Sequence, residues 1–204
     1  MLTTMIARAQ DFDDREARAG LTIGPGIQTG ASMTLDSKQG YKIKPIFAYK
    51  LEAHATYPLT PIINAGLGLG YESRGTREHV FNRSDIWQDY RVGYFTINPS
   101  FSFSGVNMGF VFGFPVGGGI TNSAGSSFDF DESDDIPVMI DARLEGVIPI
   151  YDDEVGWLSL VFGGGYSLNE LIDYPEGTEL FGDWNHVSGH IGFRFEFLVP
   201  DTER

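Results

Sequence analysis

The chain has 204 residues, of which 28 are acidic and 14 basic, and its formal net charge is −14. This acidity argues against a nucleic-acid partner, because phosphate binding needs clustered lysine and arginine side chains. The chain contains no cysteine, which excludes disulfide scaffolds and thiolate chemistry, and its 16 Phe, 9 Tyr and 3 Trp argue against disorder.

Residues 1–19 precede the patterned part of the chain. Here Ala7-Arg8-Ala9 places small residues at the −3 and −1 positions of a signal-peptidase site before Gln10. We therefore expect the remnant of an export signal and an N-terminal tail; an ordinary N-terminal tail is the alternative. No stretch of roughly 18 apolar residues follows, so the sequence predicts no transmembrane helix. A transmembrane barrel stays open, because its strands are short and alternate in polarity.

From Gly20 onwards, apolar and polar residues alternate with a period of two, in segments separated by turn-forming residues. No segment carries a helical stripe, and glycine and proline are too frequent for long helices. The pattern predicts eight strands, at 20–33, 41–57, 61–73, 90–103, 106–117, 137–150, 155–167 and 187–199.

The predicted strands divide by parity into a bulky apolar face and a face of glycine and small polar residues. Leu67 and Leu69, for example, alternate with Gly66 and Gly68. Residues 92–128 include no Asp, Glu, Lys or Arg, whereas a soluble strand pair normally has charges on its solvated face. Small residues suit the narrow lumen of an eight-stranded barrel, and the bulky face would then contact lipid. A soluble sandwich or barrel, with the bulky face as its core, is the alternative.

The lengths of the connections also favour a membrane barrel. Those at 58–61, 104–105 and 151–154 are short, whereas 73–89, 119–135 and 169–185 each span 17 residues. Outer-membrane barrels have this asymmetry, with short periplasmic turns and longer extracellular loops. An even number of strands would put both termini at the periplasmic side. We therefore predict an all-β, eight-stranded, closed, antiparallel up-and-down transmembrane β-barrel over residues 20–199, followed by a C-terminal tail at 200–204.

Aromatic residues near the predicted strand ends are typical of the girdles that lie at the two membrane interfaces. The sequence offers nine candidates without distinguishing among them. They are Tyr57, Tyr71, Trp87, Tyr90, Tyr94, Tyr151, Trp157, Tyr166 and Trp184.

The sequence also resembles a known group of proteins. The segments that carry the likeness are Gly20–Gly26, Leu69–Gly75, Asp89–Pro99 and the aromatic closing strand Gly192–Phe197. In these segments the chain is similar to the small eight-stranded outer-membrane β-barrel proteins of Gram-negative bacteria. It resembles above all the PorT-like barrels of the Bacteroidota, and more distantly the OmpA- and OmpX-type barrels. The resemblance implies barrel architecture and a location in a bacterial outer membrane, and it implies no particular activity.

Charged residues of both signs occupy the inward parity. We predict that they pair inside the barrel, because an unpaired charge in so narrow a lumen would be very costly. These residues are Lys50, Glu52, His54, Glu72, Asp141, Arg143, Glu145, His190, Arg194 and Glu196. Such a network would fix the strand register and would not conduct ions. A gated pore or a proton-linked role is the alternative.

The sequence predicts no catalytic site. His186 and Ser188 lie two residues apart, and membrane lipid A deacylases use such a pair together with a glutamate. The spacing to Glu196 does not match that arrangement, and no oxyanion hole is evident nearby. The glycine runs Gly117–Gly119 and Gly163–Gly165 lack the spacing and the following helix of a nucleotide site.

We predict no metal site or cofactor either. His186 and His190 would lie about 13 Å apart on a strand, too far to share one metal ion. Asp129, Asp131 and Asp135, with Ser133, imitate the start of a calcium loop but lack its glycine and its closing glutamate. Weak cation binding at this acidic loop stays open, against a plain solvated loop.

Function would then reside in the loops, because the lumen is occupied and the wall contacts lipid. The segments 119–135 and 169–185 each hold five acidic residues and no lysine or arginine, and together they contribute −10 of the net −14. We expect a monomeric, non-enzymatic outer-membrane protein, embedded in the bilayer, that acts structurally or binds an extracellular ligand or surface partner. The alternatives are a small pore or ligand-transport barrel, a membrane lipid hydrolase, or a soluble lipocalin-like binding barrel.

Overall fold

The computed structural model describes residues 20–35, 41–80, 82–130, 136–153, 155–169 and 185–199. The predicted export remnant and tail at 1–19 and the predicted C-terminal tail at 200–204 lie outside these residues. In the described ranges, no helix is long and apolar enough to cross a membrane.

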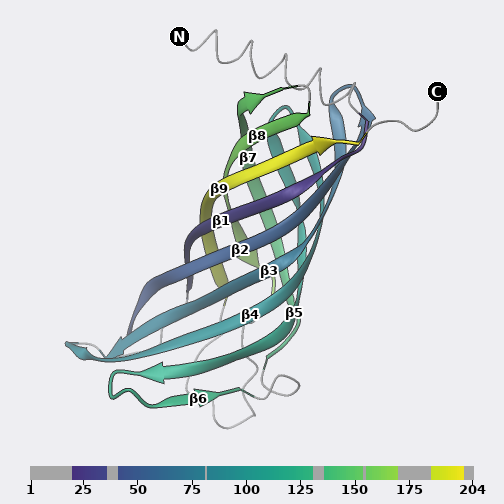
Figure 1. Cartoon of the computed structure of the whole chain (residues 1–204). Helices are drawn as coiled ribbons and strands as arrows, with labels where there is room; N and C mark the ends of the chain where they lie inside the picture. The colour runs from purple at the N-terminus through teal and green to yellow at the C-terminus, as the bar shows by residue number, and fades with distance from the viewer. Residues whose placement is uncertain are drawn as a thin grey trace.

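Nine β-strands follow one another along the described chain (Figure 1). They are β1 (Thr22–Thr34), β2 (Tyr41–Thr60), β3 (Ile63–Val80), β4 (Arg83–Phe103), β5 (Val106–Asn122), β6 (Ser127–Asp129), β7 (Met139–Asp152), β8 (Gly156–Ser167) and β9 (His186–Leu198). Their β-branched and aromatic residues, alternating with small ones, favour extended backbone over helix.

Eight of these strands close into a ring. The hydrogen-bonded order is β4-β3-β2-β1-β9-β8-β7-β5, and the pairing of β5 with β4 completes the circle (Figure 1). All the pairings are antiparallel, and β1 at the start of the barrel pairs with β9 at its end, as in Gly30↔His190. The short β6 is added to the far end of β5 through Gly119↔Asp129. The prediction of a closed eight-stranded up-and-down barrel is therefore confirmed, with one additional short strand.

The two ends of the barrel differ in their connections. At one end, tight turns join β2 to β3, β4 to β5 and β7 to β8. In the β4–β5 turn, Ser104 and Gly105 have φ angles of 50° and 77°, the left-handed pair that a type I′ hairpin turn requires. Because Thr22 pairs with Leu198, β1 begins and β9 ends at this same short-turn end.

At the other end, the predicted loop at 73–89 is wrong. This segment continues the sheet: β3 extends to Val80 and β4 starts at Arg83, and cross-strand pairs such as Arg77↔Asp89 form a protruding hairpin. Near its tip, Asn82 has a φ of 65°, a left-handed conformation that asparagine tolerates well. The hairpin was missed because strands were predicted from one apolar face, and both faces of this segment carry polar residues. The backbone hydrogen bonds that pair the two strands form without an apolar face.

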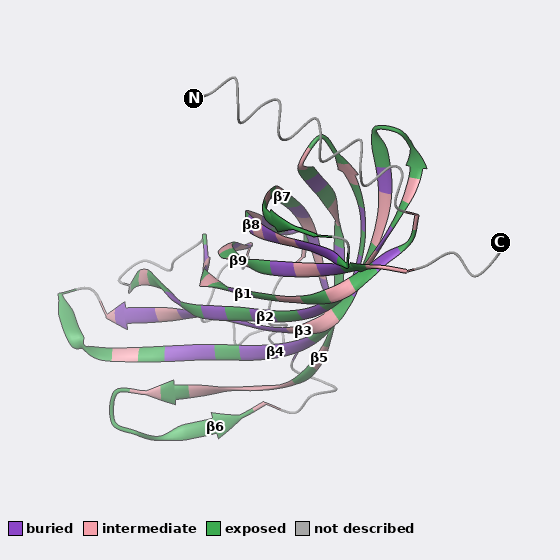
Figure 2. Ribbon diagram, turned by 45° about the horizontal axis from the view of Figure 1, so that its top comes forward, coloured by how far each residue is buried: buried purple, intermediate pink, exposed green. Residues whose placement is uncertain are grey.

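The faces of the barrel are inverted relative to a soluble protein. Along much of the barrel wall, buried and more exposed residues alternate, as Figure 2 shows. The exposed positions are large and apolar, for example Leu67, Phe101 and Phe110, which are 46 %, 57 % and 51 % exposed. The buried positions are mostly polar or charged, among them Thr96 and Asn98. A folded chain in water would bury the first set and expose the second.

Six of the nine aromatic candidates fall into two groups, and Tyr71 and Trp87 are intermediate in exposure. Tyr57, Tyr151 and Tyr166 are exposed on the outer wall. Three of the nine candidates are not on the wall: Tyr90, Tyr94 and Trp157 are buried inside the barrel, so their assignment to a girdle is wrong. The parity of their strands places them inward, and proximity to a strand end does not report which face a side chain occupies. Trp184 lies outside the described residues.

Candidate functional site

The lumen holds a network of buried charges. The ten residues that the sequence places on the inward parity belong to β2, β3, β7 and β9, and they are Lys50, Glu52, His54, Glu72, Asp141, Arg143, Glu145, His190, Arg194 and Glu196. Nine of them are at most 5 % exposed, and His190 is half-buried. Their contacts fall into three groups that follow one another along the lumen.

The first group lies nearest the end of the barrel that carries the protruding β3–β4 hairpin, here called the long-hairpin end. It consists of two arginines and two carboxylates. Arg74 Nε is 2.6 Å from Glu72 Oε1, and Arg74 Nη2 also pairs with Asp141. Arg143 Nη2 lies 2.8 Å from Glu72 Oε2 and 3.5 Å from Asp141 Oδ2. The pairs Arg74–Asp141 and Arg143–Glu72 join β3 to β7, which are not neighbours in the ring, so these two ion pairs span the lumen.

Arg74 was missed by the sequence analysis, which ended the strand at residue 73 and placed this arginine in a loop. The side chain is fully buried. The position of Arg74 could have revealed it. Arg74 is two residues beyond Glu72, and on a longer strand residues two apart lie on the same face, which here is the inward one.

The second group is centred on Glu145 of β7. Its carboxylate oxygens lie 3.5 Å from Lys50 Nζ, 3.1 Å from His190 Nε2 and 3.2 Å from Arg194 Nη2. Lys50 Nζ also lies 2.9 Å from Glu52 Oε2. Two carboxylates and two permanent cations from β2, β7 and β9 thus meet, so that each buried charge has an opposite charge nearby, as burial requires.

The third group surrounds Glu196 towards the short-turn end. Trp157 Nε1 donates a hydrogen bond of 3.0 Å to Glu196 Oε2, and the hydroxyls of Thr56 and Thr22 donate bonds of 3.0 Å and 3.3 Å to Oε1. Among the described residues, no cation lies within ion-pair distance of this carboxylate. Neutral donors from three strands hold it instead.

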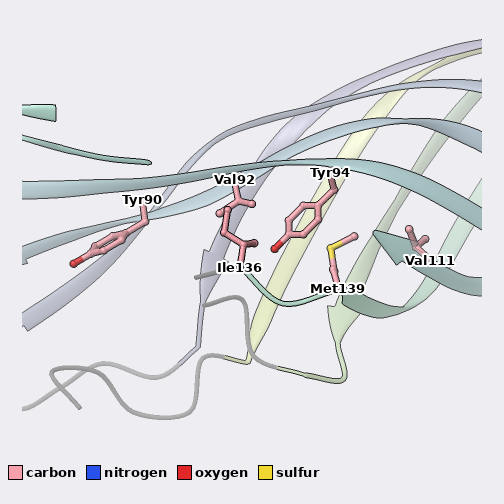
Figure 3. Packing of buried hydrophobic residues seen from close by; sticks show 6 residues of the cluster. All are labelled: Tyr90, Val92, Tyr94, Val111, Ile136 and Met139. Atoms are coloured by element: carbon pink, nitrogen blue, oxygen red, sulfur yellow. The ribbon is translucent and has the colours of Figure 1, made fainter. Parts of the chain in front are cut away.

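An apolar cluster lies beside the first ion-pair group and extends from it towards the long-hairpin end: Val92 pairs with Arg74, Tyr94 with Glu72, and Val111 with Asp141. Tyr90, Val92 and Tyr94 project inward from β4, and Ile136 and Met139 come from the segment that leads into β7 (Figure 3). Val111 of β5 completes the cluster, with Ile120 and Phe130 packed against it. We call this set the apolar cap.

The protruding hairpin carries a partly buried ion pair and, at its tip, an exposed one. Arg77 pairs with Asp89 through two contacts, of which Nη2 to Oδ2 measures 2.6 Å, and its guanidinium lies 4.3 Å from the centre of the Trp87 ring. The hydrogen bonds to Asp89 raise the pKa of Arg77. At the tip, the hydrogen bond from Arg83 lowers the pKa of Asp85.

The candidate hydrolase residues do not come together. His186 Nε2 contacts the carbonyl oxygen of Gly75 at 3.1 Å. Ser188 and Glu196 are eight residues apart on one strand, which corresponds to roughly 26 Å, and Glu196 is held by Trp157 as described. His186, Ser188 and Glu196 therefore do not form the hydrogen-bonded chain of nucleophile, base and acid that a hydrolase triad needs.

The structure does not bring the predicted metal and nucleotide residues together into a site, as far as it describes them. Among the described residues, no group of three or more His, Asp or Glu side chains could hold a metal ion. Asp129 is exposed on β6, whereas Asp131, Ser133 and Asp135 lie outside the described residues. The glycine runs at 117–119 and 163–165 lie within β5 and β8.

Comparisons with solved structures give similar barrels. No protein-family model matches the chain, and no curated protein does. Among solved structures, the attachment invasion locus protein Ail of Yersinia pestis, in complex with the heparin analogue sucrose octasulfate, is 16 % identical, with a TM-score of 0.44 over 87 % of this chain and 99 % of that one. Neisserial surface protein A is 6 % identical, with a TM-score of 0.47 over 88 % and 97 %. The outer membrane protein OprG from Pseudomonas aeruginosa is 12 % identical, with a TM-score of 0.36 over 88 % and 97 %.

The distribution of apolar and charged residues on the barrel indicates the environment that surrounds it. The closed ring of eight strands has no edge strand, its wall carries a belt of exposed Leu, Ile and Phe, and the charges at the level of this belt face inward. These are the properties of a strand-built membrane span. The chain is a membrane-spanning β-barrel. In bacterial outer-membrane barrels the short turns are periplasmic, and that rule would put the β3–β4 hairpin and the apolar cap of this barrel at an extracellular end.

Proposed function

We propose that this protein is a monomeric, non-enzymatic barrel with a filled lumen, which acts structurally or in surface interaction through its extracellular segments. The observation that supports the proposal is the sequence of contacts along the lumen. The first ion-pair group with the apolar cap beside it, the second ion-pair group and the carboxylate of Glu196 follow one another towards the periplasmic end. Such an interior favours rigidity over transport, because ions would have to displace buried, paired charges.

The extracellular segments are then the parts available to a partner. The wall contacts lipid, and the hydrolase candidates are separated along β9. The segments 119–135 and 169–185 contribute ten of the 28 acidic residues. Their clustered negative charge would favour a cationic partner or bridging by divalent cations at the cell surface.

The test neutralises this charge without shortening the chain. All acidic residues of 119–135 and 169–185 are changed to their amides in the full-length protein, produced in a bacterial outer membrane. Asp152→Asn, an exposed change at the end of β7 on the short-turn side, is the matched control. Folding is followed by heat-modifiable gel mobility, surface interaction by retention of the cells on a polylysine-coated support, and envelope integrity by survival in bile salt.

We expect the neutralised protein to fold, because none of the changed residues belongs to the lumen network. Retention or survival should fall towards that of cells without the protein, while Asp152→Asn behaves as wild type. A neutralised protein that folds and equals the wild type in both assays would contradict the role of the acidic segments.

A further inference from the structure

Cationic side chains gather on the outer wall just beyond the extracellular aromatic residues. Lys44 of β2 lies directly opposite Arg77 of β3, and Arg91 of β4 lies opposite Gly75. With Lys42, these residues make up four of the 14 basic residues in a chain whose net charge is −14. Among their described outward neighbours on β2–β4, Asp89 supplies one opposing charge and pairs with Arg77.

Two of these cations are not neutralised by a neighbour. Among the described residues, neither Lys44 nor Arg91 has a carboxylate within ion-pair distance, and both side chains are exposed. Arg91 Nη1 donates a long hydrogen bond of 3.4 Å to the carbonyl oxygen of Phe47. That carbonyl belongs to a β-bulge between Pro45 and Tyr49. The bond orients the guanidinium and leaves its other N–H groups available.

Arg91 lines a groove of about 380 Å³ on the outer wall, between β3 and β6. Tyr71 and Ser73 form one side of the groove with Arg91, the glycines 117–119 form its floor, and Asp129 stands at the far edge. A Cβ atom at Gly93 would lie 2.3 Å from the Tyr71 hydroxyl oxygen. Only glycine there lets the phenol lie flat against the sheet, with its hydroxyl in the groove.

The groove lies at the level of lipid headgroups. Tyr71 is eight residues from Ile63 at the periplasmic turn, which is roughly 26 Å along the strand and about 20 Å across the membrane at the usual strand tilt. Tyr71 and Tyr49 are neighbours with ring centres 5.8 Å apart, and such aromatic residues mark the boundary of the apolar layer. Arg91 projects from just beyond that boundary.

We propose that this groove binds the phosphate group of an anionic lipid of the outer leaflet. Arg91 supplies a charge-assisted donor, Tyr71 and Ser73 supply hydroxyl donors, and Lys44 adds positive charge nearby. The acyl chains of the lipid extend along the apolar wall below, over Phe95 and Phe114, which are 45 % and 44 % exposed. A lipid is favoured over a soluble anion because the groove opens onto this wall.

The test compares diphosphoryl lipid A with the same lipid after enzymatic removal of its phosphates, using the full chain in neutral detergent and native mass spectrometry. We expect Arg91→Gln to weaken binding of the phosphorylated lipid roughly tenfold, since a hydrogen bond to a charged group is lost. Tyr71→Phe should weaken it by a smaller factor, because a neutral donor is lost. Arg83→Gln, which removes the same charge at the exposed hairpin tip, should leave binding unchanged.

Three results would overturn the proposal. The dephosphorylated lipid could bind as tightly as the phosphorylated one, Arg83→Gln could weaken binding as much as Arg91→Gln, or Arg91→Gln could bind like wild type. Inorganic phosphate serves as a separate competitor. Displacement of the lipid by phosphate at concentrations equal to those of the lipid would identify a free-anion site and contradict the lipid assignment. Heat-modifiable mobility of each variant verifies that the barrel is folded.

Discussion

Replacing Arg74 by methionine should be among the most destabilising single changes in the barrel. The side chain has no exposed surface, and it lies between Glu72, at 2.6 Å, and Asp141. Without it, Arg143 alone faces both carboxylates, so one buried negative charge loses its partner. Breaking a buried pair in this way costs about 3–5 kcal/mol, which agrees with about 4 kcal/mol for a pair 4 Å apart at an effective dielectric constant near 20.

The free energy of unfolding can be measured by urea titration of the protein in lipid vesicles, with heat-modifiable mobility as the readout. Arg83→Met, at an exposed pair 3.3 Å from Asp85, is the matched control and should cost at most about 1 kcal/mol. Adding Glu72→Gln to Arg74→Met should restore part of the loss, with a coupling energy of about 1–3 kcal/mol. The reasoning is refuted if Arg74→Met costs no more than Arg83→Met, or if the two changes at 72 and 74 are additive.

The same unfolding assay tests three further features. Phe110→Lys, on the wall near mid-membrane, should cost about 2–4 kcal/mol, whereas Phe103→Lys beside the periplasmic turn should cost at most about 1 kcal/mol; equal costs would argue against a lipid-facing wall. Met139→Ala should cost about 2–5 kcal/mol through a cavity in the apolar cap, and a neutral effect would mean that the cap is not packed. Trp157→Phe should cost about 1–3 kcal/mol, because the buried carboxylate of Glu196 loses a donor. In a protein that already carries Glu196→Gln, Trp157→Phe should cost less. If it costs the same, the destabilisation comes from lost packing and not from the lost hydrogen bond.

The barrel could be predicted from sequence because one simple rule governs its wall. Lipid selects bulky apolar residues at every second position, so Leu67 and Leu69 alternate visibly with glycines. The connections at 104–105 and 151–154 are short enough to identify the turns, and turn position and parity together assign each strand a face.

Outside the membrane, lipid no longer selects bulky apolar residues, so the strand pattern is lost and strands there could not be predicted. Residues 73–89 carry polar side chains on both faces, so only the backbone pairing of β3 with β4 reveals a strand. Arg74 was therefore missed, although its parity matches that of Glu72. The apolar cap was missed for a related reason: Tyr94 and Met139 look like wall residues in sequence, and only the path of the segment before β7 brings them together inside.

The filled lumen is tested most directly by recording from the purified wild-type protein in planar lipid bilayers. Ion pairs that span the barrel, with the apolar cap packed beside them, predict no stable conductance steps at any holding potential that the bilayer withstands. Stable, ion-selective steps that change or disappear in Arg143→Ala or Arg194→Ala would contradict the filled lumen, because they would place the ion path among these paired charges.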